Sequence, residues 1–299
     1  MGVFFRSGIF LGLAAALGWG VADFLARFAT RRAGAYRTLI YMQLTGLLAL
    51  SAGMAATGRW TNFFPSRAEH HAWAWTICAG LLNVGSAFSL YRSFEIGVLA
   101  LVAPIAASYP VLTVLLSLWS GERLTVPHAI GVGAAIIGVM LAAVSFSSPP
   151  PESSAEDHRR HVFRGVPWAL AAAVGFGLLF WVLGFHVMPV FSGVASVWMV
   201  RITTFTMLAL LAIPLRQSAK PPGGSTLGIV AVIGVMDTAA FVANNLALKN
   251  EQVAVASVLS SLYGAVTVVL AAIFLRDKLE RTQWAGIVLI FFGIALVSI

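Results

Sequence analysis

The polar side chains that could do chemistry in this chain are few, and they stand inside long apolar segments. Trp19, Asp23 and Arg27 recur every four residues, so they share one face of a helix. A second acid, Asp237, lies inside another apolar segment. A charged side chain in hydrocarbon costs about 2.5–3.5 kcal/mol on insertion scales, so such residues are functional candidates. We therefore expect both acids to take part in handling a solute or a proton.

Each acid also has a structural interpretation, which the sequence leaves open. In this interpretation Asp23 only neutralises Arg27 one helical turn later. Asp237 forms an ion pair with Arg201 that locks two helices together, a role compatible with solute binding. Two amides, Asn244 and Asn245, follow Asp237 about two turns later and extend the same polar face.

Aromatic residues inside the apolar segments are candidates for a gate or a stacking surface. Pro104 and Pro110 stand six residues apart, and each removes a backbone hydrogen bond and permits a kink. We expect Tyr109, beside this kink, and Tyr263, opposite it, to form an aromatic gate. Simple packing of the two rings is an equally good alternative. Further ring residues either stack on an aromatic or cationic solute or pack the core; they are Trp19, Tyr91 and Trp181.

The composition identifies the solvent of most of the chain as lipid. Of 299 residues, 59% are hydrophobic and 10% charged, and the mean hydropathy is +0.89. A soluble domain carries about 25% charged residues, so the excess apolar surface needs a bilayer. Apolar segments of about 20 residues predict ten transmembrane helices, at 7–29, 36–57, 72–94, 98–120, 126–146, 165–185, 193–215, 226–248, 253–275 and 283–298. A polar linker rich in Pro, Ser and charge, 147–164, follows the fifth.

The two halves repeat. The sequence LAAALGWG at 13–20 returns as LAAAVGFG at 170–177, an offset of 157. At an offset of 154, Asn83 pairs with Asp237, Tyr91 with Asn245, Tyr109 with Tyr263 and Thr113 with Thr267. Matches at polar and tyrosine positions favour duplication over chance similarity between apolar helices.

An odd number of spans per half has a topological consequence. The second half must lie upside down relative to the first, which is the ground plan of secondary transporters with a midplane site. The fold class is therefore an all-α membrane protein with ten transmembrane helices in two inverted five-helix repeats. We place the first repeat at 1–147, the linker at 148–164 and the second repeat at 165–299.

Short motifs in this order resemble the ten-helix EamA-type branch of the drug/metabolite transporter superfamily. The motifs are Gly18-Trp19-Gly20 with Arg27, the arginines Arg37 and Arg201, Tyr109-Pro110-Val111, Gly121-Glu122-Arg123-Leu124-Thr125 and its echo Arg276-Asp277-Lys278-Leu279. The resemblance covers the chain except the linker. This sequence differs from the related small multidrug pumps. Those pumps carry a proton-exchanging Glu in the first helix, whereas the acid in the first predicted helix of this chain is Asp23.

The resemblance implies an exporter or exchanger of metabolites such as amino acids, or of amphipathic drugs, with a cavity between the halves. Asn83 and Asp237, one amide and one acid, would face each other across it. The expected partners are a small-molecule solute and the lipid bilayer, with no cofactor, metal or nucleic acid, in a monomer or homodimer of the inner (plasma) membrane. The alternatives are a non-transporting scaffold and an intramembrane enzyme acting on lipid-linked substrate, which would need a convergent catalytic cluster.

The orientation of the termini is an open conflict. If ten spans are right, the set of loops on the side of the termini carries fewer Lys and Arg residues than the other set. The positive-inside rule then places both termini outside. The family resemblance implies that they lie inside.

Overall fold

Helices form all the regular secondary structure in the part of the chain that the computed structural model describes, residues 8–58, 70–143, 164–214, 216–218, 220–275 and 281–297. The first half contains α1 (Gly8–Ala33), α2 (Ala35–Ala56), α3 (His70–Ile96), α4 (Leu99–Ala106), α5 (Pro110–Trp119) and α6 (Val126–Ala143). The second contains α8 (Val166–Val182), the π-helix η2 (Leu183–Val187), α9 (Gly193–Ala212), α10 (Gly224–Asn250), α11 (Val253–Ser261), α12 (Tyr263–Leu275) and α13 (Arg281–Val297). Nearly all of the predicted linker, and the segment that echoes the Glu122 motif, lie outside the described residues.

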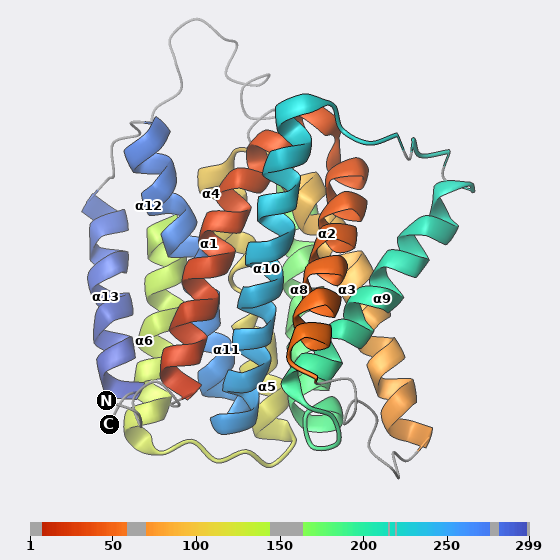
Figure 1. Ribbon diagram of the computed structural model, residues 1–299. Coiled ribbons are helices and arrows are strands. Elements are labelled where there is room, and N and C mark those ends of the chain that lie inside the picture. The colour runs from red at the N-terminus through yellow and green to blue at the C-terminus, as the bar shows by residue number, and fades with distance from the viewer. Residues whose placement is uncertain are drawn as a thin grey trace, which may run out of the picture.

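Within the described residues, eight helices are long and apolar enough to cross a bilayer, with α4–α5 and α11–α12 each counted as one path. They correspond to the first four predicted spans of each half. The fifth helices of the halves are shorter, with apolar stretches at Val126–Gly138 in α6 and Trp284–Gly293 in α13. The chain is therefore a multi-pass membrane protein. Figure 1 shows α1 beginning and α13 ending at the same end of the bundle.

The fourth path of each half is interrupted near the middle. In the first half α4 ends at Ala106 and α5 begins at Pro110, as the prolines predicted. In the second half α11 ends at Ser261 and α12 begins at Tyr263, although no proline lies there. Tyr109 caps α5 and Tyr263 opens α12, so the two tyrosines occupy equivalent places at the two breaks.

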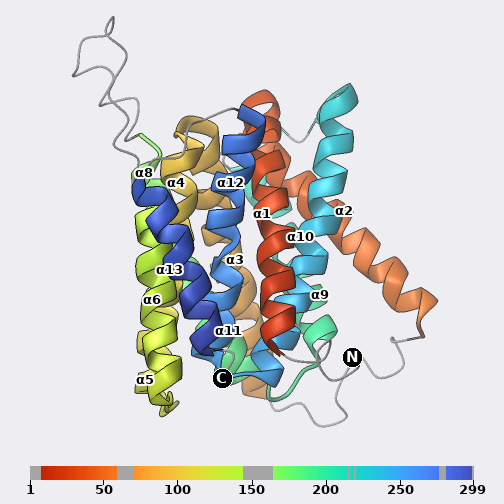
Figure 2. The same ribbon diagram turned by 90° about the vertical axis from the view of Figure 1, so that its left-hand side faces the viewer.

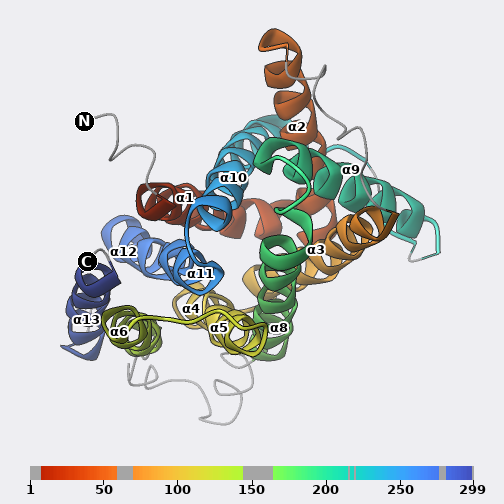
Figure 3. The same cartoon turned by 90° about the horizontal axis from the view of Figure 1, so that it is seen from below.

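Packing between the halves follows a reciprocal pattern. Helix α1 packs on α10 and α12, while α8 packs on α3 and α5, and α6 packs on α13. Figure 2 shows α6 and α13 side by side along one edge, and Figure 3 shows the remaining helices arranged around a common centre.

Two hydrogen bonds repeat this reciprocity at the level of single atoms. The Thr113 hydroxyl on α5 donates to the carbonyl of Gly177 on α8 at 3.0 Å, and the Thr267 hydroxyl on α12 donates to the carbonyl of Gly20 on α1 at 3.2 Å. Both glycines permit this approach. A Cβ on Gly177 would lie 3.0 Å from the Tyr109 carbonyl, and one on Gly20 would lie 3.1 Å from the Tyr263 carbonyl.

The α6–α13 contact depends on small residues at the crossing. A Cβ added at Gly138 would lie 2.8 Å from the carbonyl oxygen of Gly286 and 2.8 Å from the backbone nitrogen of Ile290. A Cβ at Gly293 would lie 2.6 Å from the carbonyl oxygen of Gly131. Backbone atoms cannot rotate away as side chains do, so these glycines set the distance between the helices. These small residues thus pack two helices of the same chain against each other.

Gly138→Ala should therefore separate α6 from α13 and lower the free energy of unfolding by about 1–3 kcal/mol, the usual cost of overpacking. Gly133 on the same helix is the matched control, because a Cβ there meets nothing within 4 Å. Gly133→Ala should leave stability unchanged or raise it slightly, since alanine favours a helix over glycine. Thermal unfolding of the detergent-solubilised variants measures both; equal melting temperatures for the two would contradict the packing argument.

Candidate functional site

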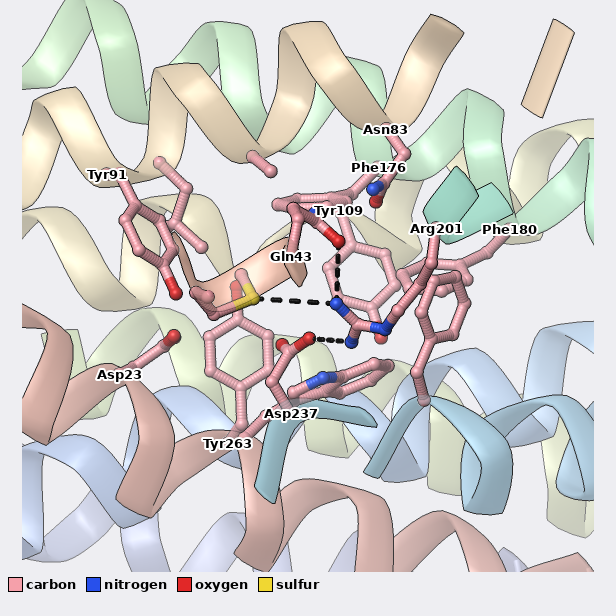
Figure 4. A pocket seen from close by; sticks show the side chains of 15 residues that line it. Asp23, Gln43, Asn83, Tyr91, Tyr109, Phe176, Phe180, Arg201, Asp237 and Tyr263 are labelled. Carbon is pink, nitrogen blue, oxygen red and sulfur yellow. Dashed lines mark hydrogen bonds and ion pairs between the residues drawn. The ribbon is translucent and has the colours of Figure 1, made fainter. Parts of the chain in front are cut away.

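A pocket with a cavity of about 50 Å³ lies between the two halves at the centre of the bundle. Helices α1, α2 and α3 of the first half and α8, α9 and α10 of the second contribute to it, together with the residues at both helix breaks. Figure 4 shows its lining side chains. They are Trp19, Asp23, Met42, Gln43, Asn83, Ala87, Leu90, Tyr91, Tyr109, Phe176, Phe180, Arg201, Asp237, Phe241 and Tyr263.

Eight of the eleven residues predicted to bind a solute line this pocket. They are Trp19, Asp23, Asn83, Tyr91, Tyr109, Arg201, Asp237 and Tyr263. They come from separate segments of the sequence, and the fold brings them together. The other three, Trp181, Asn244 and Asn245, are absent from the lining.

The guanidinium of Arg201 organises the polar side of the pocket. Arg201 is 1% exposed, and its Nη2 donates to a carboxylate oxygen of Asp237 in an ion pair. Its Nη1 donates to Oε1 of Gln43 at 2.6 Å and approaches the sulfur of Met42 at 3.5 Å. The Asp237–Arg201 pair that the sequence left open is therefore present. The side chain of Asp237 is 21% exposed, so it both pairs with Arg201 and faces the cavity.

Close packing of α2 against α10 brings Gln43 to the arginine. A Cβ on Gly234 of α10 would lie 2.6 Å from the Met42 carbonyl of α2. On the α2 side, a Cβ on Gly46 would lie 3.2 Å from Cζ of Arg201. Larger residues at either glycine would separate these helices, and the amide could not reach the guanidinium.

The second acid, Asp23, is also buried but has a different environment. It is 5% exposed, and it makes no hydrogen bond or ion pair with any described residue. In Figure 4 it extends into the pocket from the side opposite Arg201, near Tyr91 and Tyr263. A buried carboxylate without a partner is costly, so its charge is compensated either by a proton or by the contents of the pocket.

Aromatic rings form the rest of the wall. Trp19 lies 5.7 Å from Phe180, 6.1 Å from Phe241 and 6.2 Å from Tyr263, measured between ring centroids. Tyr109 lies 4.9 Å from Phe180. Rings from both halves therefore form an aromatic wall beside the polar side of the pocket.

The two tyrosines at the helix breaks stack on each other. Their ring centroids lie 6.4 Å apart at an interplanar angle of 14°. The Tyr109 hydroxyl donates to the Ser257 carbonyl at 3.0 Å and lies 2.7 Å from Oγ of Ser260. The buried Tyr263 hydroxyl has no hydrogen-bond partner among the described residues. Tyr109 thus connects the first helix break to the helix that precedes the second break. The role of the two tyrosines as a gate stays a prediction.

The three predicted residues outside the pocket lie toward one end of the bundle. The indole nitrogen of Trp181 donates to Oγ of Ser120 at 2.8 Å, just past the end of α5. Asn245 donates to Oγ of Ser196 at 2.9 Å. Asn244 is fully buried, and neither polar atom of its amide has a partner in the described part of the chain.

Seven lining residues were missing from the predicted set, namely Met42, Gln43, Ala87, Leu90, Phe176, Phe180 and Phe241. Gln43 carried a usable signal, because it is an amide in the middle of an apolar span, as Asn83 is. Met42 and Leu90 carried none, since apolar residues on a transmembrane helix face lipid, neighbouring helices or a cavity with equal ease.

Within the described residues, no group of three His, Cys, Asp or Glu side chains could hold a metal ion.

Comparison with known proteins adds family information to this geometry. The chain matches the model of the EamA-like transporter family over residues 6–144 and 163–299. A Sinorhizobium protein named "Uncharacterized transporter in cobO 3'region" is 30% identical over 126 residues, which are 42% of this chain and 82% of that protein. A solved structure titled "Crystal structure of protein" has a TM-score of 0.75 at 22% identity, over 98% of this chain and 99% of that one, and this likeness concerns the fold.

Removing one member of the buried ion pair should cost more stability than removing both. Arg201→Gln leaves the Asp237 carboxylate uncompensated, and we expect a loss of about 3–5 kcal/mol. Adding Asp237→Asn should restore much of that loss, because the remaining amides can bond to each other. The half-exposed pair Arg92–Glu95, at 2.8 Å, is the control, and Arg92→Gln should cost about 0–1 kcal/mol. Unfolding in detergent gives the free energy of unfolding of all three variants. If the losses of Arg201→Gln and Asp237→Asn simply add in the double variant, the two side chains are not coupled.

Proposed function

The chain belongs to the EamA-like transporter family, and on that premise we propose that it is a secondary transporter of a small organic solute. The solute would be a metabolite such as an amino acid, or an amphipathic drug, and the protein would export or exchange it across the inner (plasma) membrane. The observation that carries this proposal is the central pocket, because both halves line it and it contains one acid, Asp23, that has no partner among the described residues. A solute bound between two halves can be released to either side when the halves rearrange.

Ten spans in two inverted repeats are part of the proposal. The reciprocal contacts of α1 with α10 and α8 with α3 support two equivalent halves, as do the paired bonds from Thr113 to Gly177 and from Thr267 to Gly20. Counting α6 and α13 as spans gives five crossings per half, an odd number that inverts the second half. The repeats would occupy 1–147 and 165–299, joined by the linker 148–164.

Contacts between the halves at opposite ends of the bundle would have to break in turn. We call the end of the bundle where α11 begins the α11 end. There the Glu122 carboxylate accepts hydrogen bonds from the backbone nitrogens of Val253 at 2.6 Å and Ala254 at 3.0 Å. At the end where α2 begins, the α2 end, the Arg37 guanidinium donates to the backbone carbonyls of Lys220 at 2.9 Å and Pro221 at 3.0 Å. Each set joins the first half to the second, so each would resist opening at its own end.

The size of the pocket agrees with a conformational cycle. A cavity of about 50 Å³ holds a few water molecules but no amino acid. A solute can therefore enter only when the lining separates. The buried amide of Asn244 and the hydroxyls of Ser257 and Tyr263, which have no partners among the described residues, would gain hydrogen bonds when water enters.

A cysteine placed in the pocket tests alternating access directly. In a Cys78→Ser background, Ala87→Cys adds a single thiol to the pocket lining. We expect membrane-impermeant thiol reagents to label it from either side of oriented vesicles, because each conformation opens one side. Val230→Cys is the control, since Val230 is fully buried and lies outside the pocket lining. Mass spectrometry of the labelled protein gives the rates.

Labelling from neither side would favour the non-transporting scaffold, and labelling from one side would contradict alternating access. Counterflow of radiolabelled solutes in the same vesicles supplies the transport assay. Chemical conversion of a lipid-linked substrate by the purified protein would instead favour the intramembrane enzyme.

Variants at the two ends should shift the labelling in opposite directions. Glu122→Gln keeps one acceptor oxygen but removes the charge at the start of α11, so the α11 end should open more often. Arg37→Met removes the two bonds to the carbonyls of Lys220 and Pro221, so the α2 end should open more often. We expect each variant to raise the labelling rate of Ala87→Cys several-fold from its own side and to lower it from the other. Equal increases from both sides would show general loosening of the fold.

A further inference from the structure

The charges that line the central pocket do not balance. Two carboxylates, Asp23 and Asp237, and one guanidinium, Arg201, face it, so one negative charge is left over when all three are ionised. Arg201 and Asp237 form an ion pair, which assigns the surplus to Asp23. Since no described residue bonds to Asp23, its partner is a proton or a positive charge brought by the solute.

The rings beside this acid suit the same kind of ligand. Trp19 stands one helical turn from Asp23 on α1 and also lines the pocket. Trp19 packs against Phe180, Phe241 and Tyr263 within 6.2 Å. Aromatic faces attract a cation through their quadrupole and also cover an apolar group. A carboxylate next to such a wall is therefore suited to an ammonium group that carries apolar substituents.

The same charge balance disfavours anions. Both terminal nitrogens of Arg201 already donate, to Asp237 and Gln43, although its buried Nε has no partner among the described residues. Asn83 donates its amide hydrogen to Oγ1 of Thr204 at 3.0 Å. An added negative charge would also face Asp23 without compensation.

We infer that the pocket selects organic monocations with an apolar body, and that Asp23 is the residue that binds their charge. This inference rests on the proposed transport function and narrows its substrate class. Asp237, which is occupied by Arg201, positions the guanidinium and does not bind the ligand directly.

A series of ligands with one carbon skeleton and different charges tests the inference on the purified full-length protein. Phenylpropylammonium, phenylpropanol, phenylpropionate and phenylalanine share a phenyl group on a three-carbon chain. Isothermal titration calorimetry should show the ammonium binding roughly tenfold or more tighter than the alcohol, as expected for a hydrogen bond to a charged group. The anion should bind more weakly than the alcohol, because it adds a second negative charge near Asp23.

Three variants locate the effect. Asp23→Asn should abolish the advantage of the ammonium over the alcohol while the affinity for the alcohol stays the same. Trp19→Leu should weaken both ligands, and Trp19→Phe should restore most of the loss. The control Trp168→Leu alters an exposed tryptophan of α8 that packs on Phe88 outside the pocket, and it should change neither affinity. Thermal unfolding confirms that each variant is folded.

Several outcomes would overturn the inference. Equal affinity for ammonium and alcohol would remove the charge preference, and a preference that survives in Asp23→Asn would assign it to another residue. Sodium ions alone displacing the ammonium at comparable concentration would identify an inorganic cation site. Tighter binding of phenylalanine would identify a zwitterion site. Each result leaves the two-sided labelling of Ala87→Cys untouched, so it separates failure of the cation assignment from failure of the transport proposal.

Discussion

A guanidinium buried at membrane depth must be compensated where it lies, and the architecture around the pocket follows from that constraint. Arg201 on α9 needs Asp237 from α10 and Gln43 from α2, and the three side chains meet only if these helices approach closely. The glycines at 46 and 234 permit that approach, because a Cβ on either would enter the neighbouring helix. Charge compensation and close backbone packing therefore depend on each other.

The two interrupted helix paths meet a second requirement of the bilayer, that backbone groups freed at a break find partners. Tyr109, at the first break, donates to the Ser257 carbonyl in α11, just before the second break. The Glu122 carboxylate accepts from the first two backbone nitrogens of α11. Side chains of the first half thus satisfy backbone groups of the second half, near the central break through Tyr109 and at the α11 end through Glu122.

How much of this the sequence could predict depends on the kind of information each feature needs. The composition and the length of apolar segments predicted the membrane class, and the prolines predicted the break before Tyr109. The charges of Asp23, Arg201 and Asp237 inside apolar segments identified them as site candidates, because a charged side chain in hydrocarbon is costly unless it has a partner or a function. Helical spacing also extended the polar face from Asp237 to Asn244, but the pocket lining on α10 ends at Phe241. Where a cavity ends along a helix depends on the neighbouring helices, which spacing does not encode.

The asymmetry between the halves is as informative as their likeness. Duplication would give equivalent side chains on both walls, yet Asp23 on α1 corresponds to Phe180 on α8 at the offset of 157, and Asp237 on α10 corresponds to Asn83 on α3 at the offset of 154. A symmetric pocket would carry two unpaired acids or none. The pocket has instead one paired acid, one acid without a partner among the described residues, and a ring at the position equivalent to that acid, so its charged and apolar sides differ. A solute with one charged end and one apolar end would fit such a site in one orientation, and the proposed transport cycle would keep that orientation while access passes from one side of the membrane to the other.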